Sequence, residues 1–486
     1  MGAARALRLP LLAGLAFAAA AVGAAGDAGD DAGAADVLEP AEVLASAGEH
    51  FPGIVEALAD RRAAEGRVTE ALGAFDLVFK GDGLGWADGF YDGRVASGGV
   101  RRALRPLGAS LYGEYSVSRG DFPIYQDENF TNEGGDIKLG VLFSLLRDRD
   151  IDERRFRETD SRLALRQADL ELLLTRVGVQ RRALVAYWRW VAAGQELDVY
   201  ENLLRIALER EGGLKTEVES GRRARIFLTE NRQNITRRQT LVATAERAFR
   251  RAGNRLSFFY RDERGEPREP DPRRLPHPPV VEPDEAVAAV PPLDMSATLD
   301  RRPELRLLRT ATERAVRKVQ LSENALLPRL DFNLELSQPL GEVGEGGVSR
   351  DDTDTIVGLT FSVPLERRAA RGKLTQAEAE LEALRAERRR VRDRVEVELR
   401  NILLELNIAL RLMELAALEV EQAEAMRRAE IARFERGASD FFVVNVREER
   451  AADARVRYYE AFGKTRIARA NYDAATVNLE RLRIRD

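Results

Sequence analysis

The most constraining feature of this sequence is a helical pattern that runs from Lys373 to Arg436 without a proline or a glycine. Apolar residues recur there at steps of three and four, and only Arg388 breaks the stripe. At 1.5 Å per residue such a helix extends about 100 Å. The helix cannot bury its stripe alone, so it requires antiparallel neighbours. The stripe consists of Ala377, Leu381, Leu384, Val391, Val395, Leu399, Ile402, Leu406, Ala409, Met413, Ala416, Val420 and Ala423.

The same order of elements occurs twice along the chain. The stretches "LGVLFSLL" and "VGLTFSVP" share the pattern G-x-x-F-S, and each precedes a long charged segment. These segments end at "SGRRARIFLTEN" and "RGASDFFVVNVR"; Gly140 and Gly221 are 81 residues apart, and Gly358 and Gly437 are 79 apart. Such matched intervals indicate an internal duplication. We expect long helices at about 150–219 and 368–436, with return helices at about 225–258 and 440–482.

A proline-rich connector separates the two copies. Residues 259–300 contain half of the 18 prolines, so we expect little regular structure there, although a lid over an enzyme site is an alternative. The first repeat then covers residues 26–258, with strands at about 73–146. The second covers residues 301–486, with a helix at about 302–326 and strands at about 329–365.

Residues 1–25 have the pattern of a secretory signal peptide. Arg5 and Arg8 precede an apolar run, and small residues lead into the acidic "GDAGDDAG", which predicts cleavage near Ala25. The alternative is a membrane anchor, but the run is short and rich in alanine compared with the ~20 residues that span a bilayer. No other apolar run approaches that length, so any further membrane contact must come from strands.

Composition argues against an enzyme and against a nucleic-acid-binding protein. The net charge is -5, and Arg and Glu are interspersed, so no basic face is predicted. The sequence has no cysteine and only two histidines, His50 and His277. These residues are too few to supply the ligands of a Cys/His metal site, and neither suggests a His-based catalytic triad. There is no phosphate-binding loop, and no carboxylate pair stands out. We expect no enzymatic activity, no cofactor and no metal.

Three short segments, 137–143, 330–336 and 357–363, alternate apolar and polar residues with a period of two, which is typical of strands. A fourth, "LGASLYGEYSVS", places Leu107, Ala109, Leu111, Tyr115 and Val117 on one side. Each copy therefore has a strand pair ahead of its long helix. In the first three segments the residues expected to face lipid are Leu139, Val141, Phe143, Leu330, Phe332, Leu334, Leu336, Val357, Leu359, Phe361 and Val363.

The apolar sides of these strands need a partner. A soluble core is one possibility, but the neighbouring helices offer little free apolar surface. Only a closed barrel places strands in hydrocarbon with every backbone group satisfied. Four strands of ~9 to 11 residues have the length to cross a membrane, yet barrels begin at eight strands. Several chains must then contribute, and three chains would give twelve strands.

With these features the chain resembles the TolC-type outer-membrane efflux proteins, from about Asp36 to Leu482. The resemblance is carried by the duplicated plan, by "LLP" at 326–328 ahead of a strand, by "GLTFSVPL" before the second long helix, and by "FERGASDFFVVN". The fold it implies is mainly α with membrane β. Long antiparallel coiled-coil helices form a periplasmic α-barrel, and four strands per chain contribute to a trimeric twelve-stranded outer-membrane β-barrel.

The resemblance also implies partners and indicates which end of the molecule binds them. It implies a homotrimer in outer-membrane lipid, docked to a periplasmic adaptor (membrane fusion protein) and an inner-membrane RND or ABC pump, which makes the chain a passive exit duct. The two helix turns would be the periplasmic tips, although they could be mere hairpin turns. The expected docking residues are Ser220, Gly221, Arg222, Arg436, Gly437, Ala438, Phe441 and Phe442.

The sequence departs from the family in two places. Relatives often carry acidic residues six and nine positions after the turn glycine, where this chain has Val443 and Val446. An acidic ring is therefore in doubt, and the candidates for a constriction are Phe227, Asp440, Val443, Val446 and Glu448. The segment 73–105 is additional; it either pairs with the strand of Leu330 or forms a hairpin outside the barrel.

Two other functions fit parts of the pattern. A periplasmic coiled-coil adaptor or scaffold also has long helical hairpins, but adaptors usually have one hairpin between β-rich domains. An exported enzyme with a helical stalk lacks candidate catalytic residues. The sequence names no substrate.

Overall fold

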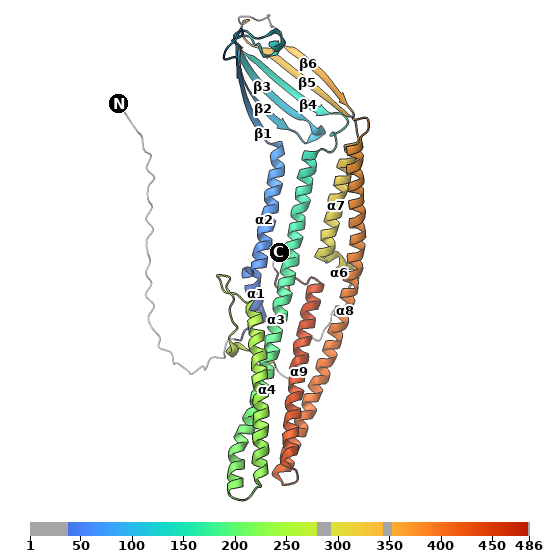
Figure 1. Ribbon diagram of the computed structural model, residues 1–486. Helices are drawn as coiled ribbons and strands as arrows, with labels where there is room; N and C mark the ends of the chain where they lie inside the picture. Colours follow the sequence, from blue (N-terminus) through green and yellow to red (C-terminus); the bar gives the residue numbers. More distant parts are fainter. Residues whose placement is uncertain (1–36, 279–292, 344–351, 485–486) are drawn as a thin grey trace, which may run out of the picture.

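The computed structural model describes residues 37–278, 293–343 and 352–484. The molecule is long, with a β-sheet at one end and helices that run from the sheet to the opposite tip (Figure 1). The predicted signal peptide, residues 1–25, lies outside the described residues.

Two helices far longer than the others dominate the described part of the chain. They are α3, of 67 residues, and α8, of 68 residues, about 100 Å each. Each begins below the sheet and ends at the tip, where a shorter helix turns back (Figure 1). The helices are α1 Pro40–His50, α2 Pro52–Leu72, α3 Glu153–Glu219, α4 Arg225–Ser257, α6 Met295–Arg301, α7 Pro303–Asn324, α8 Arg368–Glu435 and α9 Phe441–Ala475.

The helices form a slab one helix thick and four helices wide. Next to the sheet the order across the slab is α2, α3, α7, α8 (Figure 1). In the tip half α3 contacts both α4 and α9, and α9 contacts α8. The long helices therefore run through both halves, while short helices fill the remaining positions end to end. As a result α8 is an edge of the slab along its whole length, and next to the sheet α2 forms the other edge.

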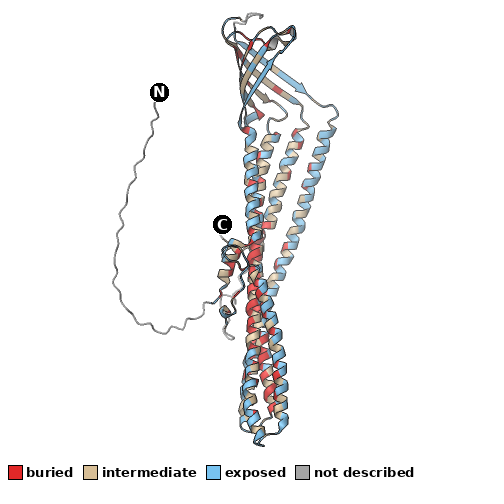
Figure 2. Ribbon diagram, turned by 60° about the vertical axis from the view of Figure 1, so that its left-hand side comes forward, coloured by how far each residue is buried: buried red, intermediate tan, exposed pale blue. Residues whose placement is uncertain are grey.

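The core lies mostly in the middle and the tip half of the slab (Figure 2). In the middle, α1 and the connector pack on α3 and α4 around Trp190, Tyr187 and Leu275. The Tyr187 hydroxyl donates a hydrogen bond of 2.7 Å to the Leu38 carbonyl, which fixes the start of the described chain to α3. The predicted stripe of α8 is buried at nine positions, namely Ala377, Leu381, Val395, Leu399, Leu406, Ala409, Met413, Ala416 and Val420.

Within the described residues, six strands form one antiparallel sheet in the order β1-β2-β3-β4-β5-β6. The sheet therefore has two strands more than the four expected, because segment 73–105 contributes a full hairpin. The strand of Leu330 pairs with β4 and β6, so the segment is not its partner. The strands are β1 Leu77–Gly85, β2 Arg94–Ala103, β3 Ser110–Arg119, β4 Asp136–Ser144, β5 Arg329–Pro339 and β6 Asp354–Ser362.

The fold is mainly helical with an antiparallel sheet and an internal repeat, as predicted. Strand β3 starts later than its sequence pattern indicated, because Leu107 sits in a short turn with a positive φ of 55°. No helix in the described ranges is long and apolar enough to cross a bilayer.

Candidate functional site

The sheet has one apolar face and one polar face, and the strand register defines both. Opposite Leu139 lies Leu336, opposite Val141 lies Leu334, and opposite Phe143 lies Phe332, so their side chains share a face. We call this the apolar face. Its exposed large side chains come from all six strands: Leu77, Phe79, Val100, Leu111, Tyr115, Ile137, Leu139, Leu336, Val357, Leu359 and Phe361.

All of the residues expected to face lipid that lie within strands are on this apolar face. Val363 comes one residue after β6 ends and is half-buried. In an isolated chain such a face is an apolar patch with no protein to cover it. Three apolar residues, Val78, Leu84 and Ile356, are exposed on the other face.

In β3, β4 and β5 most of the polar face is sheltered, and its side chains hydrogen-bond across strands. The Ser337 hydroxyl donates to Asp136 at 2.8 Å, and the Ser144 hydroxyl donates to Asp331 at 2.9 Å. The Tyr112 hydroxyl, from β3, donates to the Glu335 carboxylate of β5. Buried polar groups are stable when paired in this way, and the face is suited to water rather than to lipid.

At the opposite end of the molecule the two hairpin turns have the same backbone hydrogen bonds. Arg222 N–H donates to the Glu217 carbonyl at 2.9 Å, and Ala438 N–H donates to the Arg433 carbonyl at 2.9 Å. Both turns are Schellman caps, in which one residue takes the left-handed conformation. These residues are Gly221, with a φ of 71°, and Gly437, with a φ of 76°. The duplication thus extends to the hydrogen bonds of the tips.

A cluster of three phenylalanines joins the two tips inside the molecule. The Phe441 ring lies 6.1 Å from Phe227 of α4 and 6.2 Å from Phe434 of α8, between ring centroids. The Arg223 guanidinium stacks over Phe227 and Phe434 at 5.4 Å from each. Phe441 is 1% exposed, so its predicted role as a docking contact is wrong: the ring packs the two hairpins together. Phe442 beside it is 61% exposed.

A buried ionic cluster lies on the sheet side of the phenylalanines and links three helices. Arg238 of α4 donates to Glu448 of α9 at 3.1 Å and to the Leu203 carbonyl of α3 at 2.8 Å. Arg210 of α3 donates to the same Glu448 carboxylate and, at 3.0 Å, to Asn445. Burial lowers the pKa of the Arg238 guanidinium, and the charge of Glu448 opposes that shift.

Glu448 is 2% exposed, so the prediction that it lines a constriction is wrong. Its carboxylate is enclosed by Arg210 and Arg238 and cannot face a passage. Asp440 is exposed and caps α9 by accepting a hydrogen bond from Phe442 N–H. Val443, Val446 and Phe227 are half-buried. The other predicted docking residues, Ser220, Gly221, Arg222, Arg436, Gly437 and Ala438, are exposed at the turns.

The reading of the sequence missed Arg210, Arg238 and Phe434. A signal for Arg238 exists, because it occupies a position of the buried stripe of α4 that also contains Ile235, Ala245 and Phe249. A charged residue at such a position requires a buried partner of opposite charge. Glu448 lies in the corresponding stripe of α9, on a helix expected to be a neighbour.

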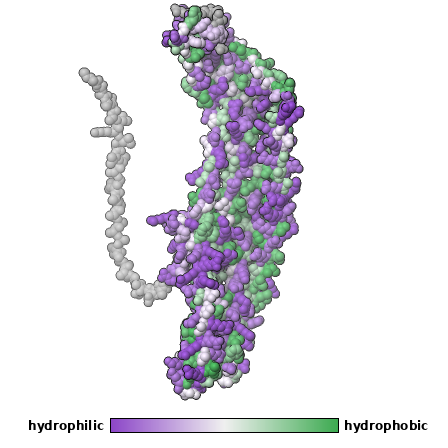
Figure 3. All heavy atoms as spheres, in the orientation of Figure 1, coloured by the Kyte–Doolittle hydropathy of each residue, from purple (hydrophilic) through white to green (hydrophobic). Residues whose placement is uncertain are grey.

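A second apolar stripe on α8 has no cover in the isolated chain. Its residues recur at helical spacing on the side away from the buried stripe. Apolar residues interrupt the hydrophilic surface along this edge of the molecule (Figure 3). The exposed residues include Val397, Leu404, Ile408, Leu412, Leu415 and Met426.

Comparison with known protein families identifies one match, which covers the second repeat. Residues 295–478 match the family described as outer membrane efflux protein. No curated protein matches the chain by sequence.

Solved structures match over nearly the whole chain. They include the outer-membrane channel OprN (15% identity, TM-score 0.61, covering 90% of this chain and 89% of that one). The outer membrane protein VceC from Vibrio cholerae is similar, with 14% identity and a TM-score of 0.59, covering 90% of this chain and 95% of that one. The MtrE outer membrane channel of Neisseria gonorrhoeae has 14% identity and a TM-score of 0.62, covering 90% of this chain and 88% of that one. At these identities the likeness establishes the fold. With the family match, it confirms the resemblance to TolC-type proteins.

Proposed function

We propose that this chain, whose residues 295–478 match the outer membrane efflux protein family, is the outer-membrane exit duct of a tripartite efflux or type I secretion system. It would carry small molecules or proteins out of a diderm bacterium. Transport through it would be passive, with the energy supplied by a partner pump.

The observation that carries this proposal is the sheet. Its apolar face exposes Leu139, Leu359 and Phe361, while its polar face holds hydrogen-bonded carboxylates and hydroxyls. Such a two-faced sheet fits a barrel wall with lipid outside and water inside. Among the described residues, β1 and β6 each have one edge without a strand partner. In lipid those edges must be paired, so copies of the chain have to complete the wall.

We propose that the complete duct is a homotrimer. The uncovered stripe of α8 supports contact between subunits along the helices, because exposed apolar stripes of this length mark interfaces. The stripe belongs to the helix that directly follows β6, so one side of the chain carries both the free edge of the sheet and, farther along α8, the apolar stripe.

The tips would dock a periplasmic adaptor that connects the duct to an inner-membrane RND or ABC pump. Exposed groups at the turns, among them Phe442, Arg222 and Arg436, offer apolar contact and hydrogen-bond donors. The phenylalanine cluster and the Glu448 cluster hold the two hairpins of a chain together. Opening would therefore take place by small rotations of packed hairpins.

Fractionation and bilayer recording test the duct. We expect trimers in the outer-membrane pellet that dissociate only on heating in detergent, and stepwise conductance when they are added to a planar bilayer. A monomer that is soluble in the periplasm without detergent, and that gives no conductance, would contradict the proposal. That result would instead favour a coiled-coil adaptor or scaffold.

A further inference from the structure

We propose that all six strands of each chain belong to the barrel wall, and that β1 of one chain pairs with β6 of the next. Three chains would then close a barrel of eighteen strands rather than twelve. This inference rests on the proposed trimeric duct. It concerns the surface that each copy offers to its neighbour and the width of the passage.

The β1–β2 hairpin is a continuous part of the sheet. Paired residues run without a gap from Leu77 opposite Arg102 to Gly85 opposite Arg94. Strand β2 then pairs along its full length with β3, from Arg94 opposite Arg119 to Ala103 opposite Ser110. A hairpin that lay outside the wall would leave β3 at the sheet edge. Here β2 covers that edge completely.

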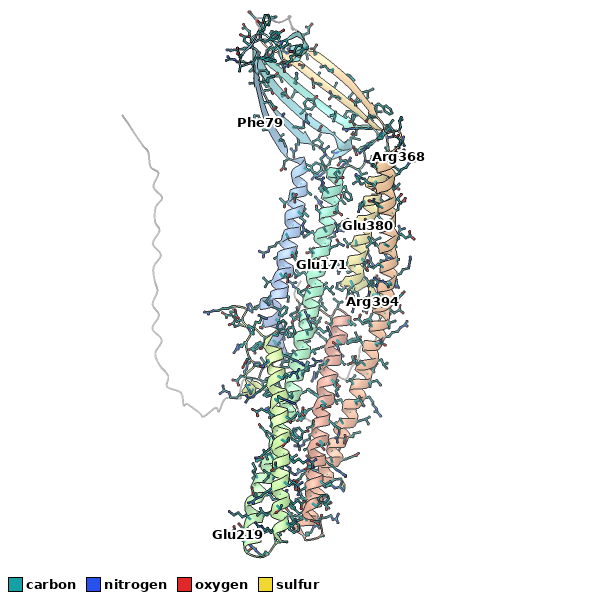
Figure 4. The ribbon with its side chains drawn as sticks, in the orientation of Figure 1. Phe79, Glu171, Glu219, Arg368, Glu380 and Arg394 are labelled. Carbon is teal, nitrogen blue, oxygen red and sulfur yellow. The ribbon has the colours of Figure 1, made fainter. Side chains whose placement is uncertain are left out.

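The two faces of the sheet also continue into β1. In the strand register, Phe79 of β1 lies opposite Val100 of β2, and Val100 lies opposite Gly113 of β3. Gly113 in turn lies opposite Leu139 of β4, so Phe79 is on the apolar face. Phe79 is 73% exposed on that face, near the helical end of its strand (Figure 4). Aromatic residues at this level suit a membrane interface. In a hairpin surrounded by water, an exposed Phe79 would have no such explanation.

The opposite side of β1 is polar at its centre. Lys80 and Asp82 alternate with Phe79 and form an ion pair of 2.8 Å. By register Lys80 lies in line with Gly99 and then Glu114, a position on the polar face. Strand β1 thus places Leu77 and Phe79 on the apolar face and Lys80 and Asp82 on the polar face, while its remaining positions are glycines on the apolar face and Val78 and Leu84 on the polar face.

The path of the chain puts β1 and β6 at the two edges where neighbouring copies meet. Strand β1 leaves α2, which is one edge of the slab, and β6 leads into α8, the other edge (Figures 1 and 4). Six strands spaced ~4.8 Å apart and tilted by ~40° cover about 38 Å of wall. Four helices at ~8–10 Å cover about 32–40 Å. Six strands therefore match the width of the slab beneath them, whereas four would cover about 25 Å.

The consequence for transport is a wide outlet. Barrel diameter grows roughly linearly with strand number, so eighteen strands enclose about twice the cross-section of twelve. Barrels of that size hold a water-filled channel. Selection by size would then occur at the tips, and the membrane part would pass whatever the tips admit.

Disulfide crosslinking tests the pairing of β1 with β6. The sequence has no native cysteine, so every disulfide formed comes from the introduced cysteines. Lys80→Cys is combined in one chain with a cysteine at Asp354, Ile356, Gly358 or Thr360, which are the polar-face positions of β6. The matched control combines Glu114→Cys, on β3, with the same four positions. Facing residues of paired strands fall within the Cα separation that a disulfide allows.

We expect covalent dimers and trimers on a non-reducing denaturing gel from the Lys80 series and none from the Glu114 series. Crosslinks in the Glu114 series alone would overturn the inference and leave the trimeric duct standing. A trimer that forms no crosslink in the Lys80 series would also overturn it. Failure to form a trimer at all would reject the duct as well.

A second measurement does not depend on disulfide geometry. In membranes, Phe79→Cys should resist a water-soluble maleimide as strongly as Leu139→Cys does, because both would face lipid. Lys80→Cys should react through the lumen, as Lys138→Cys should. Rapid labelling of Phe79→Cys with protection of Leu139→Cys would place the β1–β2 hairpin in water. It would then refute the proposal that this hairpin is part of the barrel wall.

Discussion

Glu448 lies between two guanidinium groups in the interior of the tip, and this placement decides how the two hairpins of a chain hold together. It accepts hydrogen bonds from Arg210 on α3 and Arg238 on α4, while its own helix, α9, belongs to the other hairpin. A buried charge whose partner is removed is costly, more so than an exposed pair. The cluster therefore resists separation of α9 from α3 and α4.

Replacing this carboxylate should loosen the tip. We expect Glu448→Gln to reduce the free energy of local opening by about 3 kcal/mol, because two buried guanidinium groups lose their counter-charge. Hydrogen exchange of the α9 amides near the tip should become roughly 100-fold faster. The control is Glu414→Gln, since Glu414 forms an exposed pair with Arg411 and its loss should change exchange by no more than about threefold. Equal effects of the two substitutions would contradict this view of the cluster.

Such residues are hard to predict because a charged side chain on a helix usually faces water. The chain has 157 charged Asp, Glu, Lys and Arg residues, and among the described residues eleven of them are buried. Only the position of Arg238 in the stripe of α4 distinguishes it. The same reasoning failed for Phe441, where an aromatic residue next to a turn was expected to be exposed and is buried.

The helical elements follow from local sequence to a high degree. The repeat of apolar residues in α8 predicted both the length of this helix and the side that is buried. The glycines at positions 221 and 437 predicted the two turns. Strands β4, β5 and β6 were expected from alternation. The place of segment 73–105 stayed open between pairing with the strand of Leu330 and a hairpin outside the barrel, because Gly81, Gly83 and Gly98 occupy positions on the apolar face and interrupt its period of two.

The turn at Gly437 gives a test at this scale. No atom lies within 4 Å of where a Cβ would be, so a side chain at this position would project from the exposed turn into solvent. We expect Gly437→Arg to abolish transport and leave the trimer intact, because the side chain would obstruct the adaptor. Strain at a positive φ adds about 1 kcal/mol, which the tip should tolerate.

Two controls separate docking from folding. Gly437→Asn tolerates the same backbone conformation and should retain more transport than the arginine variant. Gly372→Arg introduces the same side chain into open space near the sheet end of α8, far from the tip, and should transport normally. If Gly437→Arg transports like the parent protein, the docking role of the turn is wrong.

At the scale of the whole molecule, we propose that the chain is one part of a cylinder. The slab of four helices and the sheet of six strands share their edges, and the surfaces left uncovered are the apolar face, the stripe of α8 and the two free strand edges. A sequence can indicate these surfaces one by one. How many strands a chain contributes depends on hydrogen bonds between segments far apart, which local patterns do not specify.

The central claim is that the apolar face of the sheet is in contact with lipid. A fluorophore attached to single cysteines, in protein reconstituted with nitroxide-labelled lipid, measures this directly. We expect strong quenching at Leu139→Cys and Phe361→Cys and little at Lys138→Cys and Thr360→Cys, their neighbours on the polar face. Quenching that is equal at all four positions, or absent at the first two, would contradict the account.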